Sequence, residues 1–211
     1  MDKIDQALSH LHWLGHSSFR LDGPPIVYFD PWKVPANSPP ADLILISHEH
    51  HDHCSPEDVG AVRQKSTVVV ANPSAAKRLK GPVTVLRPGE QTTAAGVEIK
   101  AVPAYNVDKR YHVREADHVG FVVNVGGVRF YHSGDTDHIP EMADIECDVA
   151  LLPVSGTYVM TADEAAAAAT VISPRVAVPM HYGAGVAGTI ADAQRFRDLV
   201  KGKVVILLQT E

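Results

Sequence analysis

The chain has 211 residues, of which 45% are hydrophobic, and its formal net charge is -6. This length suits one hydrophobic core, so we expect a single domain over residues 1–211. The acidic balance argues against extended nucleic acid as a partner, because phosphate backbones are bound by clustered Lys and Arg. Two cysteines exclude a disulfide framework, and no apolar run approaches membrane-spanning length. We therefore expect a cytoplasmic protein with no membrane partner.

The predicted elements form two successive runs, each with strands first and alternating strands and helices afterwards. In the first run we expect strands at 8–14, 17–21, 26–29 and 43–46, a helix at 56–64, a strand at 67–71, a helix from residue 73 and a strand at 83–86. In the second run we expect strands at 97–102, 119–125, 128–132 and 149–152, a helix capped by Thr161 and Glu164, a strand at 176–179, a helix at 190–200 and a strand at 204–208. The runs divide the chain into halves near 1–95 and 96–211. This order predicts an α/β fold with helix-covered sheets.

A histidine-rich stretch follows the apolar strand 43–46. It reads Ser47-His48-Glu49-His50-His51-Asp52-His53-Cys54. If the strand stays extended, His48, His50 and Asp52 project to one face, and the chain must turn at His53. Imidazole and carboxylate ligands suit zinc, manganese or iron, and the lack of a paired cysteine argues against a closed structural zinc site. The stretch therefore predicts a metal-binding element.

Other candidate ligands follow later predicted strands. Asp135 lies in a turn after strand 128–132, His181 stands between strand 176–179 and Gly183, and Asn106 follows strand 97–102. Metal sites in α/β proteins draw ligands from the carboxyl ends of several strands. Each residue alone is weak evidence, but together with the histidine-rich stretch they predict one shared site.

Several motifs together give the chain a family resemblance. They are His48-x-His50-x-Asp52-His53, Trp13-Leu14-Gly15-His16-Ser17-Ser18-Phe19, Asp30-Pro31-Trp32, Pro103-Ala104-Tyr105-Asn106, Tyr131-His132-Ser133-Gly134-Asp135-Thr136 and Pro179-Met180-His181-Tyr182-Gly183. The chain resembles the metallo-β-lactamase superfamily, in particular the branch containing L-ascorbate-6-phosphate lactonase and N-acylphosphatidylethanolamine phospholipase D. The resemblance implies a four-layer αββα sandwich, with two mixed β-sheets flanked by helices.

The resemblance also implies a binuclear metal centre, with up to two Zn²⁺ ions per chain and with manganese or iron as alternatives. His48 and His50 would hold one metal, Asp52, His53 and His181 a second, and Asp135 would bridge them. Relatives usually place a histidine where Asn106 stands, and an amide oxygen is a poorer zinc ligand. Either the first metal is held more weakly or His112, in the same loop, replaces the missing ligand. His118 is a weaker substitute because it directly precedes a strand.

Other residues near the motifs keep two interpretations each. His16 either faces the site or is a hydrogen-bonded structural histidine. His51 and Glu49 are expected to support the ligands or to face solvent. Tyr105, Tyr158 or Tyr182 could stabilise negative charge during a reaction, and the basic group Lys109, Arg110 and Arg114 either meets a small anion or is a solvated loop.

These features predict a metal-dependent hydrolase that uses a metal-bound hydroxide on a small ester, lactone or phosphodiester. Asp52 would orient the hydroxide or accept its proton. The expected partner is a small molecule, in one version an anionic one. Two alternatives come from other classes: a nuclease that processes RNA or DNA, and a non-hydrolytic metal-binding or redox-linked module that lost hydrolysis when Asn106 appeared.

Overall fold

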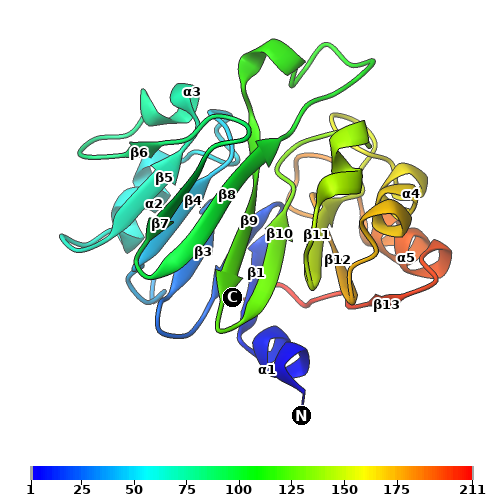
Figure 1. The fold of residues 1–211 in the computed structure, drawn as a ribbon, viewed down its shortest axis with the longest axis horizontal. Coiled ribbons are helices and arrows are strands. Elements are labelled where there is room, and N and C mark those ends of the chain that lie inside the picture. The colour runs from blue at the N-terminus through cyan, green and yellow to red at the C-terminus, as the bar shows by residue number, and fades with distance from the viewer. Residues whose placement is uncertain (1, 211) are drawn as a thin grey trace.

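The computed structural model describes residues 2–210, and the first half of the chain forms a six-stranded mixed sheet (Figure 1). Strands β1 to β3 are antiparallel neighbours, and β3 to β6 run parallel to one another. They cross the sheet in chain order: β1 (Leu11–Gly15), β2 (Ser18–Leu21), β3 (Val27–Phe29), β4 (Leu43–Ile46), β5 (Val68–Ala71) and β6 (Thr84–Val85).

The second half forms a seven-stranded sheet with the same plan. Strands β7 to β10 are antiparallel, and β10 to β13 are parallel. The strands are β7 (Gln91–Ala94), β8 (Val97–Pro103), β9 (Val119–Val125), β10 (Val128–His132), β11 (Val149–Pro153), β12 (Val176–Met180) and β13 (Lys203–Val204). The change of sheet falls between β6 and β7, a few residues before the expected boundary near residue 95.

Helices cover the outer faces of the two sheets. Figure 1 shows α2 (Pro56–Val62) and α3 (Pro73–Ala76) on one side of the molecule, and α4 (Ala162–Ile172) and α5 (Ile190–Leu199) on the other. Two 3₁₀ turns, η1 (Arg114–Ala116) and η2 (Pro140–Asp144), lie in connecting segments. The predicted αββα sandwich with two mixed sheets is confirmed.

Strand β4 shows how the sequence builds these layers. Its four residues are fully buried, and alternate side chains point to opposite faces of the sheet. Leu43 and Leu45 belong to the core between the sheets, whereas Ile44 and Ile46 belong to the core that also holds Val59 of α2. Burial on both faces explains the unbroken apolar run and fixes the start of the loop that begins at Ser47.

Two predicted strands were wrong in extent. The chain begins with a helix, α1 (Lys3–Ser9), where the predicted strand started at residue 8, because the Asp2 side chain accepts hydrogen bonds from the backbone N–H groups of Ile4 and Asp5. The last strand was predicted at 204–208, but β13 covers only Lys203–Val204. Strand β7 was not predicted, because the sequence Gln-Thr-Thr-Ala lacks the apolar alternation of a half-buried strand.

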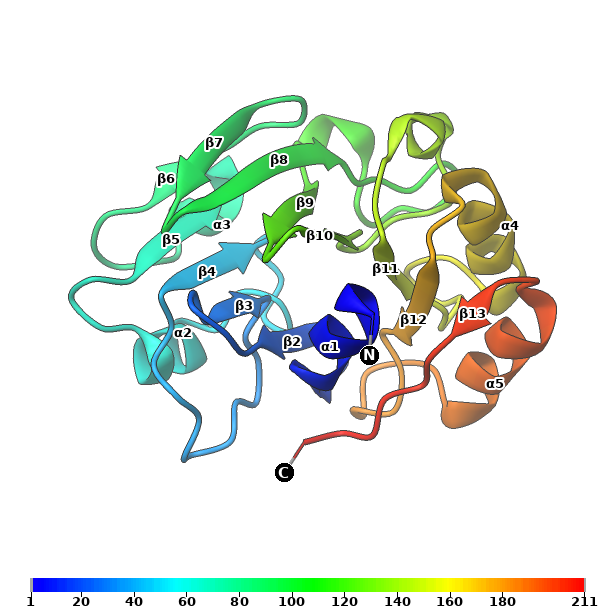
Figure 2. The ribbon, with the colours of Figure 1, turned by 60° about the horizontal axis from the view of Figure 1, so that its bottom comes forward.

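The segment after β13 joins the two sheets. Figure 2 shows it as the red trace that leaves β13 and passes α1. The Thr210 N–H donates to the Trp13 carbonyl, and the Gln209 side-chain amide donates to the Leu14 carbonyl at 3.0 Å. The segment that follows β13 therefore forms hydrogen bonds with β1 of the other sheet instead of extending its own strand.

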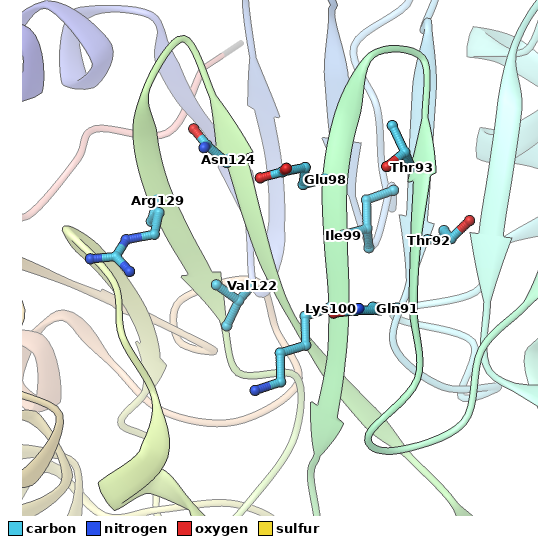
Figure 3. A pocket seen from close by; sticks show the side chains of 9 residues that line it. All are labelled: Gln91, Thr92, Thr93, Glu98, Ile99, Lys100, Val122, Asn124 and Arg129. Atoms are coloured by element: carbon cyan, nitrogen blue, oxygen red, sulfur yellow. The ribbon is translucent and has the colours of Figure 1, made fainter.

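The second sheet also has a polar outer surface away from the helices. Figure 3 shows Glu98, Lys100, Asn124 and Arg129 projecting from β8, β9 and β10. They line a hollow of about 490 Å³. None of the candidate ligands lines this hollow.

Candidate metal centre

The candidate ligands gather where strands of both sheets end. The loop after β4, the turn after β10 and the exit of β12 each supply ligands, and two further loops supply the rest. The residues brought together are His16, His48, His50, Asp52, His53, His112, Asp135 and His181.

Three histidine nitrogens converge at one end of the cluster. His48 Nε2 lies 3.1 Å from His50 Nδ1, which lies 3.0 Å from His112 Nε2. One ring proton on His50 Nδ1 cannot serve both contacts. Nitrogens bound to a tetrahedral zinc at about 2.0–2.1 Å lie roughly 3.3 Å apart, which is close to this spacing. The three nitrogens therefore fit one metal ion.

A second group lies beside the first. Its potential ligand atoms, from His16, Asp52, His53 and His181, all lie within 4.8 Å of one another. His16 Nε2 is 3.1 Å from Asp52 Oδ2, and both side chains are buried. The structure thus places His16 at the site and supports the first of its two interpretations.

Asp135 lies between the two groups. Its Oδ1 is 3.3 Å from His53 Nε2, and its Oδ2 is 3.2 Å from His181 Nε2 and 3.4 Å from His112 Nε2. Within the described chain, His53 Nε2 and Asp135 Oδ1 are buried without a hydrogen-bond partner. Buried polar atoms are rarely left without partners. These two atoms would gain a partner if metal ions were bound between the side chains.

Burial sets the protonation of most ligands. It lowers the pKa of His112 and of His16 to about 4, and it holds the pKa of His48 well below its ordinary value. These rings are therefore neutral at pH 7, which is the form that binds metals. Burial opposes ionisation of Asp135, yet the neighbouring His181 and His53 outweigh it and hold the pKa of this carboxyl well below its ordinary value.

Asp30 supports two ligands, a role that its place in the Asp30-Pro31-Trp32 motif does not predict. Its Oδ2 lies 2.8 Å from His53 Nδ1 and accepts from the Ser47 hydroxyl at 2.6 Å. That hydroxyl lies 2.9 Å from His48 Nδ1. A carboxylate on the outer nitrogen of a ligand histidine fixes its tautomer and orientation. Ser155 supports His181 Nδ1 in the same way at 2.8 Å.

We expect Asp30→Asn to lower zinc affinity by about 10- to 100-fold, because His53 loses the carboxylate that orients it and the Ser47 hydroxyl, which contacts His48, loses the carboxylate to which it donates. Competition with a zinc-binding dye measures the change. Asp22→Asn, at the half-exposed partner of Arg20, is the matched control and should keep the wild-type affinity. Equal affinities for Asp30→Asn and the wild type would show that Asp30 does not support the centre.

Asn106 points its amide nitrogen at two backbone carbonyls, one in its own loop and one in the segment between β11 and α4. Nδ2 donates to the Tyr158 carbonyl at 2.6 Å and to the Tyr111 carbonyl at 2.9 Å, and the Asn106 N–H donates to the His112 carbonyl. His112 Nδ1 lies 3.2 Å from the Tyr158 carbonyl, so a proton there leaves Nε2 free to bind a metal. Of the two outcomes expected for this loop, the structure shows His112 in the cluster and Asn106 supporting it.

Other histidines of the region lie outside the ligand set. His118 is buried and stacks on His48 with ring centroids 4.8 Å apart, but its Nε2 faces Glu49 Oε2 at 3.1 Å. His51 has a side chain that is 80% exposed. His132 Nε2 lies 2.8 Å from the Ser17 carbonyl, so this residue supports the neighbouring loop.

The backbone at the site is strained. Eight non-glycine residues among 2–210 have positive φ, and four of them are His16, Asp30, His112 and His181, with φ of 54°, 43°, 54° and 61°. Such conformations persist where the surrounding structure enforces them, and they cluster at functional sites.

A cavity of about 230 Å³ opens onto the cluster. Its lining includes the candidate ligands His50, Asp52, His112, Asp135 and His181, together with Tyr111, Tyr158 and Val186. Of the three tyrosines considered from the sequence, Tyr158 alone is at the cavity. The Tyr105 hydroxyl donates to Glu141, and Tyr182 stacks on Trp13.

Comparison with known proteins identifies the family. The family model described as "Beta-lactamase superfamily domain" matches residues 10–181. A UPF0173 metal-dependent hydrolase from Pyrococcus furiosus is 35% identical, and the match covers 92% of this chain and 94% of the relative. The chain belongs to the metallo-β-lactamase superfamily.

Two solved structures share its fold. A protein from Parabacteroides distasonis, named as a metal-dependent hydrolase, has a TM-score of 0.84 and 34% identity, with 95% of this chain and 93% of that chain covered. Igni18, a metallo hydrolase from Ignicoccus hospitalis, has a TM-score of 0.74 and 25% identity, with 95% of each chain covered.

This protein is a metal-dependent hydrolase. It belongs to this superfamily, and it matches relatives named as metal-dependent hydrolases over almost their whole length. The hydrolytic prediction is confirmed at that level, and the non-hydrolytic alternative loses its support. Among residues 2–210, no helix is both long and apolar enough to cross a membrane. The cytoplasmic location stays a prediction.

Proposed function

We propose that this hydrolase binds two divalent metal ions, preferentially zinc, and cleaves a small ester, lactone or phosphodiester. The observation that carries the proposal is the position of Asp135, whose carboxylate contacts ligands of both groups. The first ion would be held by His48, His50 and His112, and the second by Asp52, His53 and His181, with Asp135 shared between them.

The chain's own residues orient the reacting groups. When bound, divalent metals supply Lewis acidity and lower the pKa of water to about 7. His16 Nε2 lies 3.1 Å from Asp52 Oδ2, and the Asp52 carboxylate lines the cavity. With one oxygen on the second ion, Asp52 would keep its other oxygen to orient the reacting groups or accept a proton. His51 Nδ1 lies 3.6 Å from Asp52 Oδ1, and its ring is exposed to solvent.

A small molecule is the partner that best suits this site. The cavity of about 230 Å³ is smaller than the roughly 300–1,000 Å³ that drug-sized ligands occupy. The net charge of -6 continues to argue against a nuclease role. The resemblance of the motifs to the lactonase-containing branch supports the inclusion of lactones.

Metal content of gently purified, tag-free protein tests the proposal. We expect two zinc ions per chain by mass spectrometry, and about one in His181→Ala, because this variant loses a ligand of the second group. His10→Ala, at an exposed position, is the control and should keep two. One iron or one zinc per wild-type chain would contradict the two-metal centre. Lack of hydrolysis of all three substrate classes by zinc-loaded protein would contradict the proposed reaction.

A further inference from the structure

Three lining residues of the cavity that are not candidate metal ligands, Tyr111, Tyr158 and Val186, carry information about the substrate, and we call them the apolar wall. Tyr111 comes from the loop between β8 and β9, Tyr158 from the segment between β11 and α4, and Val186 from the segment between β12 and α5. The two tyrosine rings meet edge to face, with centroids 5.1 Å apart and planes at 89°. This arrangement offers an apolar corner to a bound molecule.

From this wall we infer that the substrate is an uncharged carbonyl ester or lactone whose non-reacting part is apolar and lies against Tyr111, Tyr158 and Val186. The inference rests on the proposed function and narrows its substrate class.

Charge at the cavity supports an uncharged substrate. No lysine or arginine among residues 2–210 lines the cavity, whereas Asp52 and Asp135 do. Binding of phosphate or carboxylate groups in proteins relies on charge-assisted hydrogen bonds, most often from Arg or Lys. An anionic group against this wall would lose its hydration without gaining such a donor.

Basic side chains near the cavity are already engaged. Lys109 pairs with Asp137, and Arg114 pairs with Glu141 at 2.8 Å. Arg110 lies over the Tyr111 ring and donates to its hydroxyl. The Lys33 ammonium donates to the Ala184 carbonyl and lies over the Trp32 ring. The basic side chains of Lys109, Arg110 and Arg114 therefore contact other residues of the protein and do not line the cavity.

The apolar wall is tied to the metal ligands by one side chain. The Asn106 amide donates to the backbone carbonyls of both Tyr111 and Tyr158, in the same loop that presents His112. The distance between wall and ligand is therefore fixed before a substrate arrives, which positions the scissile carbonyl relative to the cluster.

Matched esters test the inference on zinc-loaded protein. 4-Methylphenyl acetate and 4-acetoxybenzoate share the reacting acetyl group and differ in whether the far end is neutral or anionic. We expect kcat/KM for the neutral ester to be higher by about tenfold or more, because the anionic end is desolvated without a partner. Preference for 4-acetoxybenzoate, or for the anionic phosphodiester methyl phenyl phosphate, would overturn the inference.

Variants of the wall provide a second test. Tyr111→Ala and Tyr158→Ala should each raise KM for 4-methylphenyl acetate by about five- to tenfold with kcat changed less, because apolar contact area is lost. Val186→Arg should shift the preference toward 4-acetoxybenzoate, whereas Val113→Arg, at an exposed position outside the wall, should not. An unchanged KM in both tyrosine variants, or equal shifts in the two arginine variants, would overturn the inference.

A binding measurement separates this inference from the proposed reaction. Ligand-observed NMR on metal-free protein compares 4-methylacetophenone with 4-acetylbenzoate, neither of which can be hydrolysed. Binding of the neutral ketone that is weakened in Tyr158→Ala supports the wall even if zinc-loaded protein hydrolyses no ester, in which case only the proposed reaction fails. Tighter binding of 4-acetylbenzoate overturns the inference while leaving the metal centre intact.

Discussion

Asp135→Ala is expected to lower kcat/KM by at least about 10³-fold, equivalent to roughly 4 kcal/mol of transition-state stabilisation. The reason is that this one carboxylate contacts ligands of both groups, so its removal should weaken the binding of both ions. Metal counting and steady-state kinetics with 4-methylphenyl acetate measure the two effects on the same sample.

Two further variants sharpen this result. Asp135→Asn keeps the shape of the side chain but removes its charge, so its activity should lie between those of alanine and the wild type. Asp144→Ala removes an exposed carboxylate from the 3₁₀ turn η2 and should leave both readouts unchanged. Two ions per chain and near wild-type turnover in Asp135→Ala would show that the carboxylate does not link the ions.

His112→Ala is expected to reduce the metal content to about one ion per chain and to lower kcat/KM by roughly 10²-fold or more, because only His48 and His50 remain in the first group. Cobalt substitution gives an independent readout, since loss of one of two ions lowers the visible absorbance of the loaded protein. Retention of two tightly bound ions would exclude His112 as a ligand.

The double variant Asn106→His/His112→Ala moves the histidine to the position where the family resemblance predicts one. We expect the second equivalent of metal to return, because residue 106 belongs to the same loop and its side chain contacts the His112 ring. The variant also loses the amide bonds to Tyr111 and Tyr158, so its unfolding free energy should fall by about 1–3 kcal/mol. Asn106→His alone controls for this loss. A double variant that binds no more metal than His112→Ala would contradict the exchange.

Local patterns were sufficient for most of the fold. The buried run of β4 and the capping box of α4 each depend on residues close together in the sequence, and the structure contains both elements. Strand β7 could not be predicted, because it is a polar edge strand that is held by pairing with β8 rather than by its own pattern. The short β13 reflects contacts with β1 that lie almost 200 residues away.

For the candidate site, spacing revealed the residues and tertiary contacts revealed their arrangement. His48, His50, Asp52 and His53 form a compact motif that stands out in the sequence. Asp30 does not, because its partners Ser47 and His53 lie 17 and 23 residues away. The placement of His112 against His50 spans 62 residues, so the sequence could offer it only as one of two explanations for Asn106.

The left-handed backbone at His16, Asp30, His112 and His181 implies a trade-off between activity and stability in this protein. Each such conformation lowers the free energy of unfolding by on the order of 1 kcal/mol or more, so the four together lower it by roughly 4 kcal/mol. This is a large fraction of the roughly 5–15 kcal/mol free energy of unfolding of a typical domain. Selection for stability alone would favour glycine at these positions. The catalytic cluster therefore narrows the range of further mutations that the fold can tolerate, and evolution toward new substrates has more freedom in the loops that carry Tyr158 and Val186 than in the turns that carry the ligands.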